Sequence, residues 1–154
     1  MTARKDFLQS LTLGKKSEPT AEYAPSLRSP WRASIAVLIG GALGSLLRFL
    51  LSTAVNEFLP RNFPWGILFV NILGSFIIGL LAGVLVGRFE LNAFWRAGIF
   101  IGLLGGFTTF SSFSLDTVSL IQAGSFATAA MNIFASIIFC LLATALGFLV
   151  AKAV

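Results

Sequence analysis

Long apolar stretches alternate with short polar ones along most of this chain. Four apolar stretches cover about Trp31–Val55, Trp65–Val86, Trp95–Leu120 and Phe126–Val150. Each matches or exceeds the roughly 20 residues that a helix needs to cross the hydrocarbon core of a bilayer. The pattern predicts an all-α membrane protein with four transmembrane helices and with both termini on one side.

Residues 1–30 lack this pattern, because they are polar and contain three prolines. We expect them to form a disordered cytosolic tail ahead of a transmembrane domain at residues 31–154. In the alternative interpretation, Phe7, Leu8 and Leu11 line one side of a short amphipathic helix that rests on anionic lipid.

Basic residues near the ends of the apolar stretches orient the helices, because cytoplasmic loops carry an excess of lysine and arginine. Among the basic residues near the spans, only Arg61 lies on one side of the bundle. The other side receives Arg28, Arg32, Arg88, Arg96 and Lys152. This bias predicts that both termini lie in the cytoplasm.

Composition narrows the possible functions. Hydrophobic residues make up 56 % of the chain and charged residues 11 %, which is too little charge for a soluble surface. The single Cys140 and the lack of histidine argue against a zinc or other transition-metal site. The net charge of +5 could suggest nucleic-acid binding, but the basic residues lie at the edges of the apolar stretches, so we interpret the charge as a sign of topology. No long extramembrane segment is available for a soluble active site, so we do not expect an enzyme.

Glycines recur at every fourth position in two of the stretches: Gly40 and Gly44 in the first, and Gly79, Gly83 and Gly87 in the second. Such spacing gives a helix a smooth stripe that allows close contact between backbones. We interpret the stripes as packing surfaces. Four thin helices enclose little space for a pore, so we also expect the chain to oligomerise.

The third stretch contains GGFTTFSSFSLD at residues 105–116, which is unusually polar for a membrane span. Gly105 and Gly106 lower the cost of a break in the helix, and the hydroxyls that follow can satisfy the backbone groups that a break would free. An unwound turn would also expose carbonyl oxygens. Such oxygens suit an alkali cation better than an anion.

Phe107, Phe110 and Phe113 are spaced by three residues, which predicts a row of rings along one side of the third segment. Such a row is ordinarily core packing. Beside serine and threonine hydroxyls, however, the positive ring edges could hold a small anion without any fixed positive charge. Weak donors of this kind would let an anion leave again, as conduction requires.

Polar residues in the second and fourth stretches could extend such a route. Asn71 has an amide that can donate to an anion, and Ser75 lies on the same helix face. The fourth stretch carries a polar residue at every fourth position: Asn132, Ser136, Cys140 and Thr144. Interhelical hydrogen bonding and pore lining both explain this stripe.

Two charged residues complete the candidate site. Arg48 lies well inside the first stretch, where a charge is costly and marks a functional candidate, unless its side chain extends to the outer interface. Asp116 closes the polar segment, where it could cap a helix or face a vestibule. One isolated carboxylate is weak evidence for proton coupling.

Three segments together resemble the CrcB/Fluc family of fluoride channels: GGALGSLLRF at residues 40–49, FPWGILFVNILGSFIIG at 63–79 and GLLGGFTTFSSFSLD at 102–116. The resemblance covers nearly everything from residue 33 onward. It implies an antiparallel, dual-topology homodimer with two pores in the bacterial inner membrane and a broken third helix. Residues 31–154 would then be the channel domain.

The resemblance also implies roles for individual residues. The backbone carbonyls of Gly105 and Thr108 would bind one structural sodium ion at the centre of the dimer. Phe110 and Phe113 would face fluoride, Asn71 would match the pore asparagine of the family, and Arg48 its first-span arginine. With the hydroxyls and amides described above, the expected fluoride pore comprises Asn71, Thr109, Phe110, Ser112, Phe113, Asn132 and Ser136.

The chain departs from the family pattern at two positions. Asp116 stands where the family commonly has glutamate, and Asn132 stands where it often has tyrosine. The charge bias also conflicts with dual topology, because dual-topology proteins usually have balanced charges. The protein could therefore have one orientation and pair with an oppositely inserted paralogue.

The main hypothesis is passive efflux of fluoride through the cell membrane, which would lower fluoride in the cytoplasm. The alternative is a small multidrug-type exporter, which would need a protonatable carboxylate deep in a span, conventionally the first, where this chain has Arg48. A third hypothesis, a structural membrane subunit, explains the glycine stripes but not the polar third span.

Overall fold

A computed structural model of the protein describes residues 30–85 and 91–153. Every regular element in these ranges is helical: α2 (Pro30–Phe58), α3 (Trp65–Leu85), α4 (Ala93–Arg96), η2 (Ala97–Leu104), α5 (Gly105–Phe107), α6 (Phe110–Gln122) and α7 (Phe126–Ala153). The segment η2 is a π-helix. The all-helical prediction is thus confirmed for the described ranges. The predictions for residues 1–29, Gly87 and Arg88 fall outside them.

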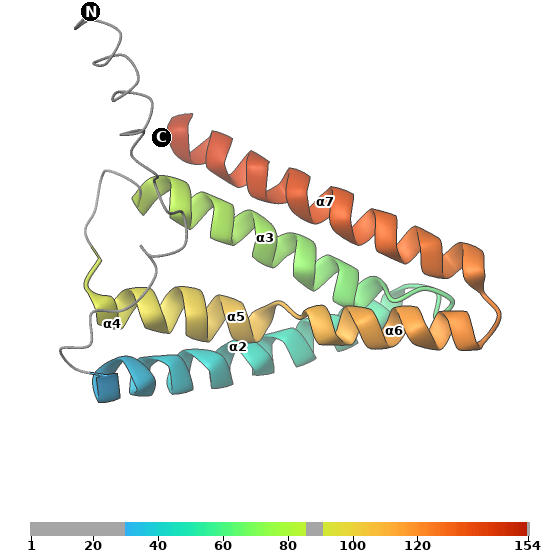
Figure 1. The fold of residues 1–154 in the computed structure, drawn as a ribbon, viewed down its shortest axis with the longest axis horizontal. Helices are drawn as coiled ribbons and strands as arrows, with labels where there is room; N and C mark the ends of the chain where they lie inside the picture. The colour runs from blue at the N-terminus through green and yellow to red at the C-terminus, as the bar shows by residue number, and fades with distance from the viewer. Residues whose placement is uncertain (1–29, 86–90, 154) are drawn as a thin grey trace, which may run out of the picture.

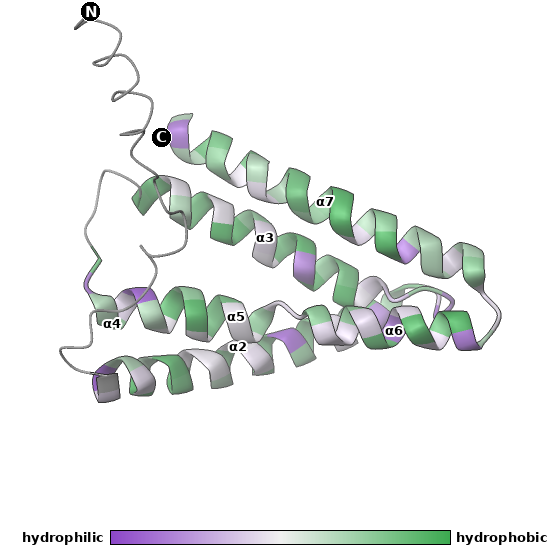
Figure 2. Ribbon diagram, in the orientation of Figure 1, coloured by the Kyte–Doolittle hydropathy of each residue, from purple (hydrophilic) through white to green (hydrophobic). Residues whose placement is uncertain are grey.

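Four helical segments are long and apolar enough to cross a membrane: Trp31–Phe58, Trp65–Leu85, Ala93–Gln122 and Phe126–Ala153. Their bounds lie close to those expected from the sequence. Figure 2 shows mainly hydrophobic ribbon along these segments, with few hydrophilic positions. The chain is therefore a multi-pass membrane protein.

The helices pack mainly as two pairs, α3 with α7 and α2 with the third segment (Figure 1). Glycine allows the close approach in the first pair. A Cβ atom placed on Gly79 would meet the carbonyl oxygen of Thr144, and one placed on Gly147 would meet the carbonyl oxygen of Phe76. The interpretation of Gly79 as a packing residue is confirmed, whereas Gly147 was not singled out from the sequence.

The second pair packs in the same way. A Cβ atom on Gly40 would meet the backbone of Gly98 and Leu103, and one on Gly44 would meet the backbone of Leu103 and Phe107. Both first-span glycines are thus confirmed as packing residues. Their contacts hold α2 directly against η2 and against Phe107, near the start of the polar run.

Short connections join the helices at the end where α2 finishes and α3 begins. The side-chain oxygen of Asn56 accepts a hydrogen bond of 2.9 Å from the backbone N–H of Gly66, which ties the end of α2 to the start of α3. Between α6 and α7, Gly124 has φ of 74°, a left-handed conformation that glycine adopts without strain.

Candidate functional site

The third membrane-spanning segment is interrupted near its middle. Helix α5 ends at Phe107, and Thr108 and Thr109 have extended backbones, with φ/ψ of −81°/155° and −152°/120°. Helix α6 then begins at Phe110 (Figure 1). This agrees with the interruption expected from the glycine pair and the hydroxyls. The π-helix that precedes the interruption was not predicted.

The interruption frees backbone oxygens. Thr108 donates twice to the carbonyl oxygen of Leu104, from its N–H and from its hydroxyl, each at 2.9 Å. Within residues 30–85 and 91–153, by contrast, the carbonyl oxygens from Gly105 to Thr108 accept no hydrogen bond. Neutral carbonyl oxygens suit a hard alkali cation. The sodium site expected at Gly105 and Thr108 stays a prediction.

Asn71 of α3 satisfies the extended backbone at the interruption. Its side-chain amide donates to the carbonyl oxygen of Thr109 at 3.1 Å, and its side-chain oxygen accepts from the N–H of Thr109 at 2.8 Å. An amide NH₂ group has two donors, so one N–H of Asn71 remains for another partner. The structure thus brings Asn71 and Thr109 together.

Hydroxyl groups cluster where α6 begins. The hydroxyl of Thr109 accepts from the N–H of Ser112 at 3.2 Å, which caps the helix. The same hydroxyl lies 3.0 Å from that of Ser111 and 3.2 Å from that of Ser112. Thr109 is buried and Ser111 is exposed, so the cluster leads from the interior of the chain to its surface.

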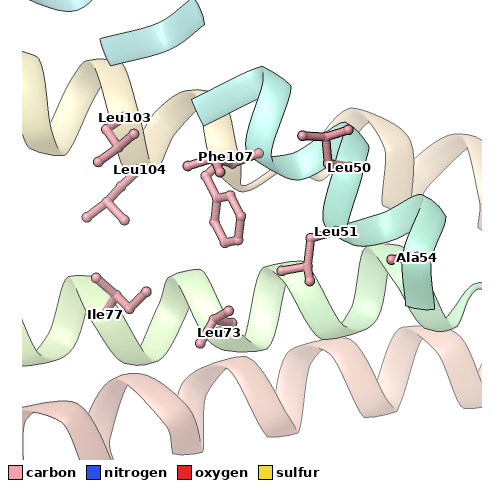
Figure 3. A pocket seen from close by; sticks show the side chains of 9 residues that line it. Leu50, Leu51, Ala54, Leu73, Ile77, Leu103, Leu104 and Phe107 are labelled. Carbon is pink, nitrogen blue, oxygen red and sulfur yellow. The ribbon is translucent and has the colours of Figure 1, made fainter. Parts of the chain in front are cut away.

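The three phenylalanines do not form one row. Phe110 and Phe113 contact each other, with ring centroids 5.3 Å apart, and Phe110 is 79 % exposed. Phe107 is buried and points into an apolar pocket between α2, α3 and the third segment (Figure 3). The prediction of a continuous row is wrong because the two extended residues separate Phe107 from the rings of α6.

The apolar pocket has a volume of about 520 Å³. Leucine, isoleucine, alanine and phenylalanine side chains line it: Leu47, Leu50, Leu51, Ala54, Leu73, Ile77, Leu103, Leu104 and Phe107. This lining offers no donor to an anion, so the pocket is distinct from the hydroxyl cluster.

Two members of the polar stripe on α7 make interhelical hydrogen bonds. Asn132, which is 2 % exposed, donates to the hydroxyl of Thr117 at 2.9 Å. Thr144 donates to the carbonyl oxygen of Ser75 at 3.1 Å. Hydrogen bonding thus accounts for these two residues. Pore lining by Asn132 and by the buried Ser136 stays a prediction.

Thr117 is a polar residue that the sequence reasoning did not single out. Its hydroxyl donates to the carbonyl oxygen of Phe113 at 2.7 Å and accepts from Asn132. It therefore links the helix that carries Phe110 and Phe113 to α7. Its spacing of four residues from Phe113 was the available signal, because a threonine hydroxyl commonly bonds to the carbonyl one helical turn earlier.

The charged candidates lie in different surroundings. Arg48 is half-buried within α2 and, among the described residues, forms no salt bridge or hydrogen bond. Asp116 lines a polar pocket of about 620 Å³, together with Glu57 and Arg61, near the end of α2. That position agrees with a carboxylate that faces a vestibule. In the described ranges no group of three or more metal-binding side chains occurs, so a cation site here would depend on backbone oxygens.

Comparisons with known proteins complete the description of the chain. Residues 35–148 match the sequence model of a family described as "CrcB-like protein, Camphor Resistance (CrcB)". A Methylococcus capsulatus protein named "Fluoride-specific ion channel FluC" is 44 % identical over 117 residues, which cover 76 % of this chain and 51 % of that protein. The chain thus spans about half the length of that relative.

Two further relatives with the same printed name match along nearly their whole length. The Magnetococcus marinus protein is 46 % identical over 116 residues, which cover 75 % of this chain and 94 % of the relative. The Geobacter metallireducens protein is 44 % identical over 118 residues, which cover 77 % of this chain and 95 % of the relative. The similarity includes all four membrane-spanning segments.

Proposed function

The chain belongs to the CrcB-like family, and from that premise we propose that it is a fluoride-specific channel for passive efflux across the bacterial inner membrane. The relatives' printed names support fluoride as the ion. The structural observation that carries the proposal is the interruption at Thr108 and Thr109. It joins the Asn71 amide of α3 to Thr109, next to the hydroxyl cluster and the two phenylalanine rings at the start of α6.

Selectivity would come from weak neutral donors. Fluoride must lose water to enter a narrow path, and the hydroxyls of Thr109 and Ser112 and the free N–H of Asn71 can replace that water. The edges of the Phe110 and Phe113 rings carry partial positive charge and add to this set. Because none of these donors carries a full positive charge, the ion is bound weakly enough to pass through the channel.

The membrane potential would drive the efflux. Hydrogen fluoride is neutral and crosses lipid, then ionises inside the cell. A potential that is negative inside favours outward movement of the anion by about 2.3 kcal/mol per 100 mV. The channel therefore needs no energy source of its own.

Fluoride efflux from reconstituted vesicles tests this proposal directly. Purified protein in vesicles loaded with fluoride is expected to release the ion to an external fluoride electrode, with little release of chloride. Proton-coupled export of organic cations without fluoride efflux would instead support the multidrug-type alternative. Absence of fluoride efflux rejects the proposed function.

We further propose that two copies of the chain pair in opposite orientations around one sodium ion. The ion would be bound by the carbonyl oxygens of Gly105 and Thr108 from each copy, and its role would be to hold the copies together. Two features support this. These oxygens have no partner among the described residues, and a Cβ atom on Gly105 would meet only the carbonyl oxygen of Phe100, at 3.7 Å, so this surface is open. An oppositely oriented paralogue could replace the second copy.

Removal of sodium is expected to impair the dimer or its conduction. Exchange of sodium for N-methyl-D-glucamine, which is too large for a site made by carbonyl oxygens, should lower both the dimer fraction in native mass spectrometry and the fluoride efflux. Restoring sodium should restore both. Equal dimer fraction and equal efflux in the two buffers would contradict the sodium site while leaving fluoride conduction untouched.

Replacement of Phe110 or Phe113 by isoleucine is expected to lower fluoride efflux by about tenfold, the upper range for one aromatic contact. Isoleucine keeps the apolar character of the site but lacks the ring edge. The measurement is initial efflux rate, compared with thermal unfolding of the same protein. Phe134→Ile is a matched control, because Phe134 is an exposed ring on α7 and not on the helix that carries Phe110 and Phe113. Parallel losses of efflux and stability would indicate that the rings are packing residues.

A further inference from the structure

One end of the bundle carries only positive charge among the described residues. Arg32, Arg96 and Lys152 lie there, where α2 and α4 begin and α7 ends (Figure 1). The carboxylates in the described ranges, Glu57 and Asp116, line the polar pocket near the opposite end of α2. A negatively charged surface would therefore be attracted to the first end and not to the second.

At this end the side chain of Arg32 is already positioned against an aromatic ring. Its guanidinium group lies over the indole of Trp31, 5.4 Å from the ring centre, and both residues are exposed. Stacking leaves the edge of the planar guanidinium available, and that edge can donate two parallel hydrogen bonds to a phosphate. No salt bridge from Arg32 to another described residue competes for it.

A second tryptophan lies on α4, which contacts α2. The side-chain oxygen of Asn92 accepts a hydrogen bond of 3.1 Å from the backbone N–H of Trp95 and so caps this helix. The ring of Trp95 packs edge-on against Phe94, with centroids 5.4 Å apart, yet Trp95 is 55 % exposed. Arg96 follows directly, so each of the two helices presents an indole next to an arginine.

The length of α2 indicates what these side chains meet. Its 29 residues extend over about 43 Å at 1.5 Å per residue, whereas the hydrocarbon core is about 30 Å thick. The first turn of α2 can therefore reach the headgroup layer. Indole rings favour this layer, and basic residues are attracted to its anionic lipids. A small soluble anion would gain nothing from the exposed indoles.

We propose that Trp31, Arg32, Trp95 and Arg96 form a docking surface for the phosphate headgroup of an anionic phospholipid. Charge complementarity and the exposed indoles are the reasons for proposing an anionic lipid as the partner. A bound headgroup would hold the start of α2 against α4. Further along, Gly40 and Gly44 of α2 contact the third segment, which begins with α4. The proposal does not depend on which ion the protein conducts.

Native mass spectrometry of the full-length protein tests the docking surface. Protein incubated with an equal mixture of phosphatidylglycerol and phosphatidylcholine is expected to retain mainly phosphatidylglycerol. Arg32→Gln should retain about fivefold less, the effect of one basic residue near an anionic surface. Arg61→Gln, which removes an arginine near the opposite end, should retain as much as the wild type.

Trp31→Leu provides a second variant that keeps every charge and should also retain less phosphatidylglycerol. Thermal unfolding in lipid-free detergent tests whether each variant is folded. If Arg32→Gln does not fold, the result for Trp31→Leu decides the question. Equal retention of phosphatidylglycerol by the folded variant and the wild type would overturn the proposal. So would equal retention of the two lipids, or displacement of phosphatidylglycerol by an equal concentration of inorganic phosphate.

Discussion

Replacing Asn71 by alanine is expected to lower the free energy of unfolding by about 2 kcal/mol, the cost of leaving buried backbone groups without partners. Asn71 is the hydrogen-bond partner of the Thr109 N–H, and it also donates to the Thr109 carbonyl oxygen. If this whole loss of free energy destabilises the interrupted conformation of the third segment, the population of that conformation decreases about thirtyfold. Fluoride efflux from vesicles should decrease in the same proportion.

Asn56→Ala is the matched control for this prediction. Asn56 also bonds to backbone through its side chain, with one hydrogen bond of 2.9 Å to Gly66, but it is exposed, so water can replace it. Loss of this hydrogen bond should lower the free energy of unfolding by about 0.5–1 kcal/mol and should leave most of the fluoride efflux intact. Asn71→Asp keeps the acceptor but removes the donor, and should lose efflux as well. Unchanged efflux and stability in Asn71→Ala would show that the interruption persists without this clamp.

Most of the fold could be predicted from the sequence, because its determinants are local. Apolar length alone gives the spans. The spacing of Gly40, Gly44 and Gly79 indicates the surfaces that meet, since only glycine permits such close backbone contact. The π-helix at Ala97–Leu104 could not be predicted, because a shift of hydrogen bonding by one residue has no compositional signal.

The candidate site was predictable in its composition but not in its contacts. Glycine and hydroxyl residues around Thr108 indicate an interruption, since they lower its cost. The bonds between Asn71 and Thr109 join residues 38 positions apart, and no local pattern specifies such a pairing. The same holds for Thr117 and Asn132. The position of Phe107 depends on two extended residues, Thr108 and Thr109, so helical spacing alone placed its ring wrongly.

Gly44→Ala is expected to destabilise the protein by about 1–3 kcal/mol, the usual cost of adding a methyl group to a tightly packed interface. The new Cβ atom would meet the carbonyl oxygen of Leu103, and it would lie 2.9 Å from the nitrogen of Phe107. Both atoms belong to the backbone and cannot rotate away, so α2 and the third segment must separate. Unfolding in mixed micelles measures the loss, and vesicle efflux measures its effect on the interruption next to Phe107.

Gly41→Ala isolates the steric part of this effect. The two glycines lie in the same helix, so both substitutions gain the same helix propensity, up to about 1 kcal/mol. A Cβ atom on Gly41 would meet only the carbonyl oxygen of Gly102, at an ordinary 3.9 Å. Gly41→Ala should therefore be neutral or slightly stabilising and should retain efflux. If the two variants unfold alike, close contact between α2 and the third segment does not determine stability, and the interruption is held in place by Asn71 rather than by this interface.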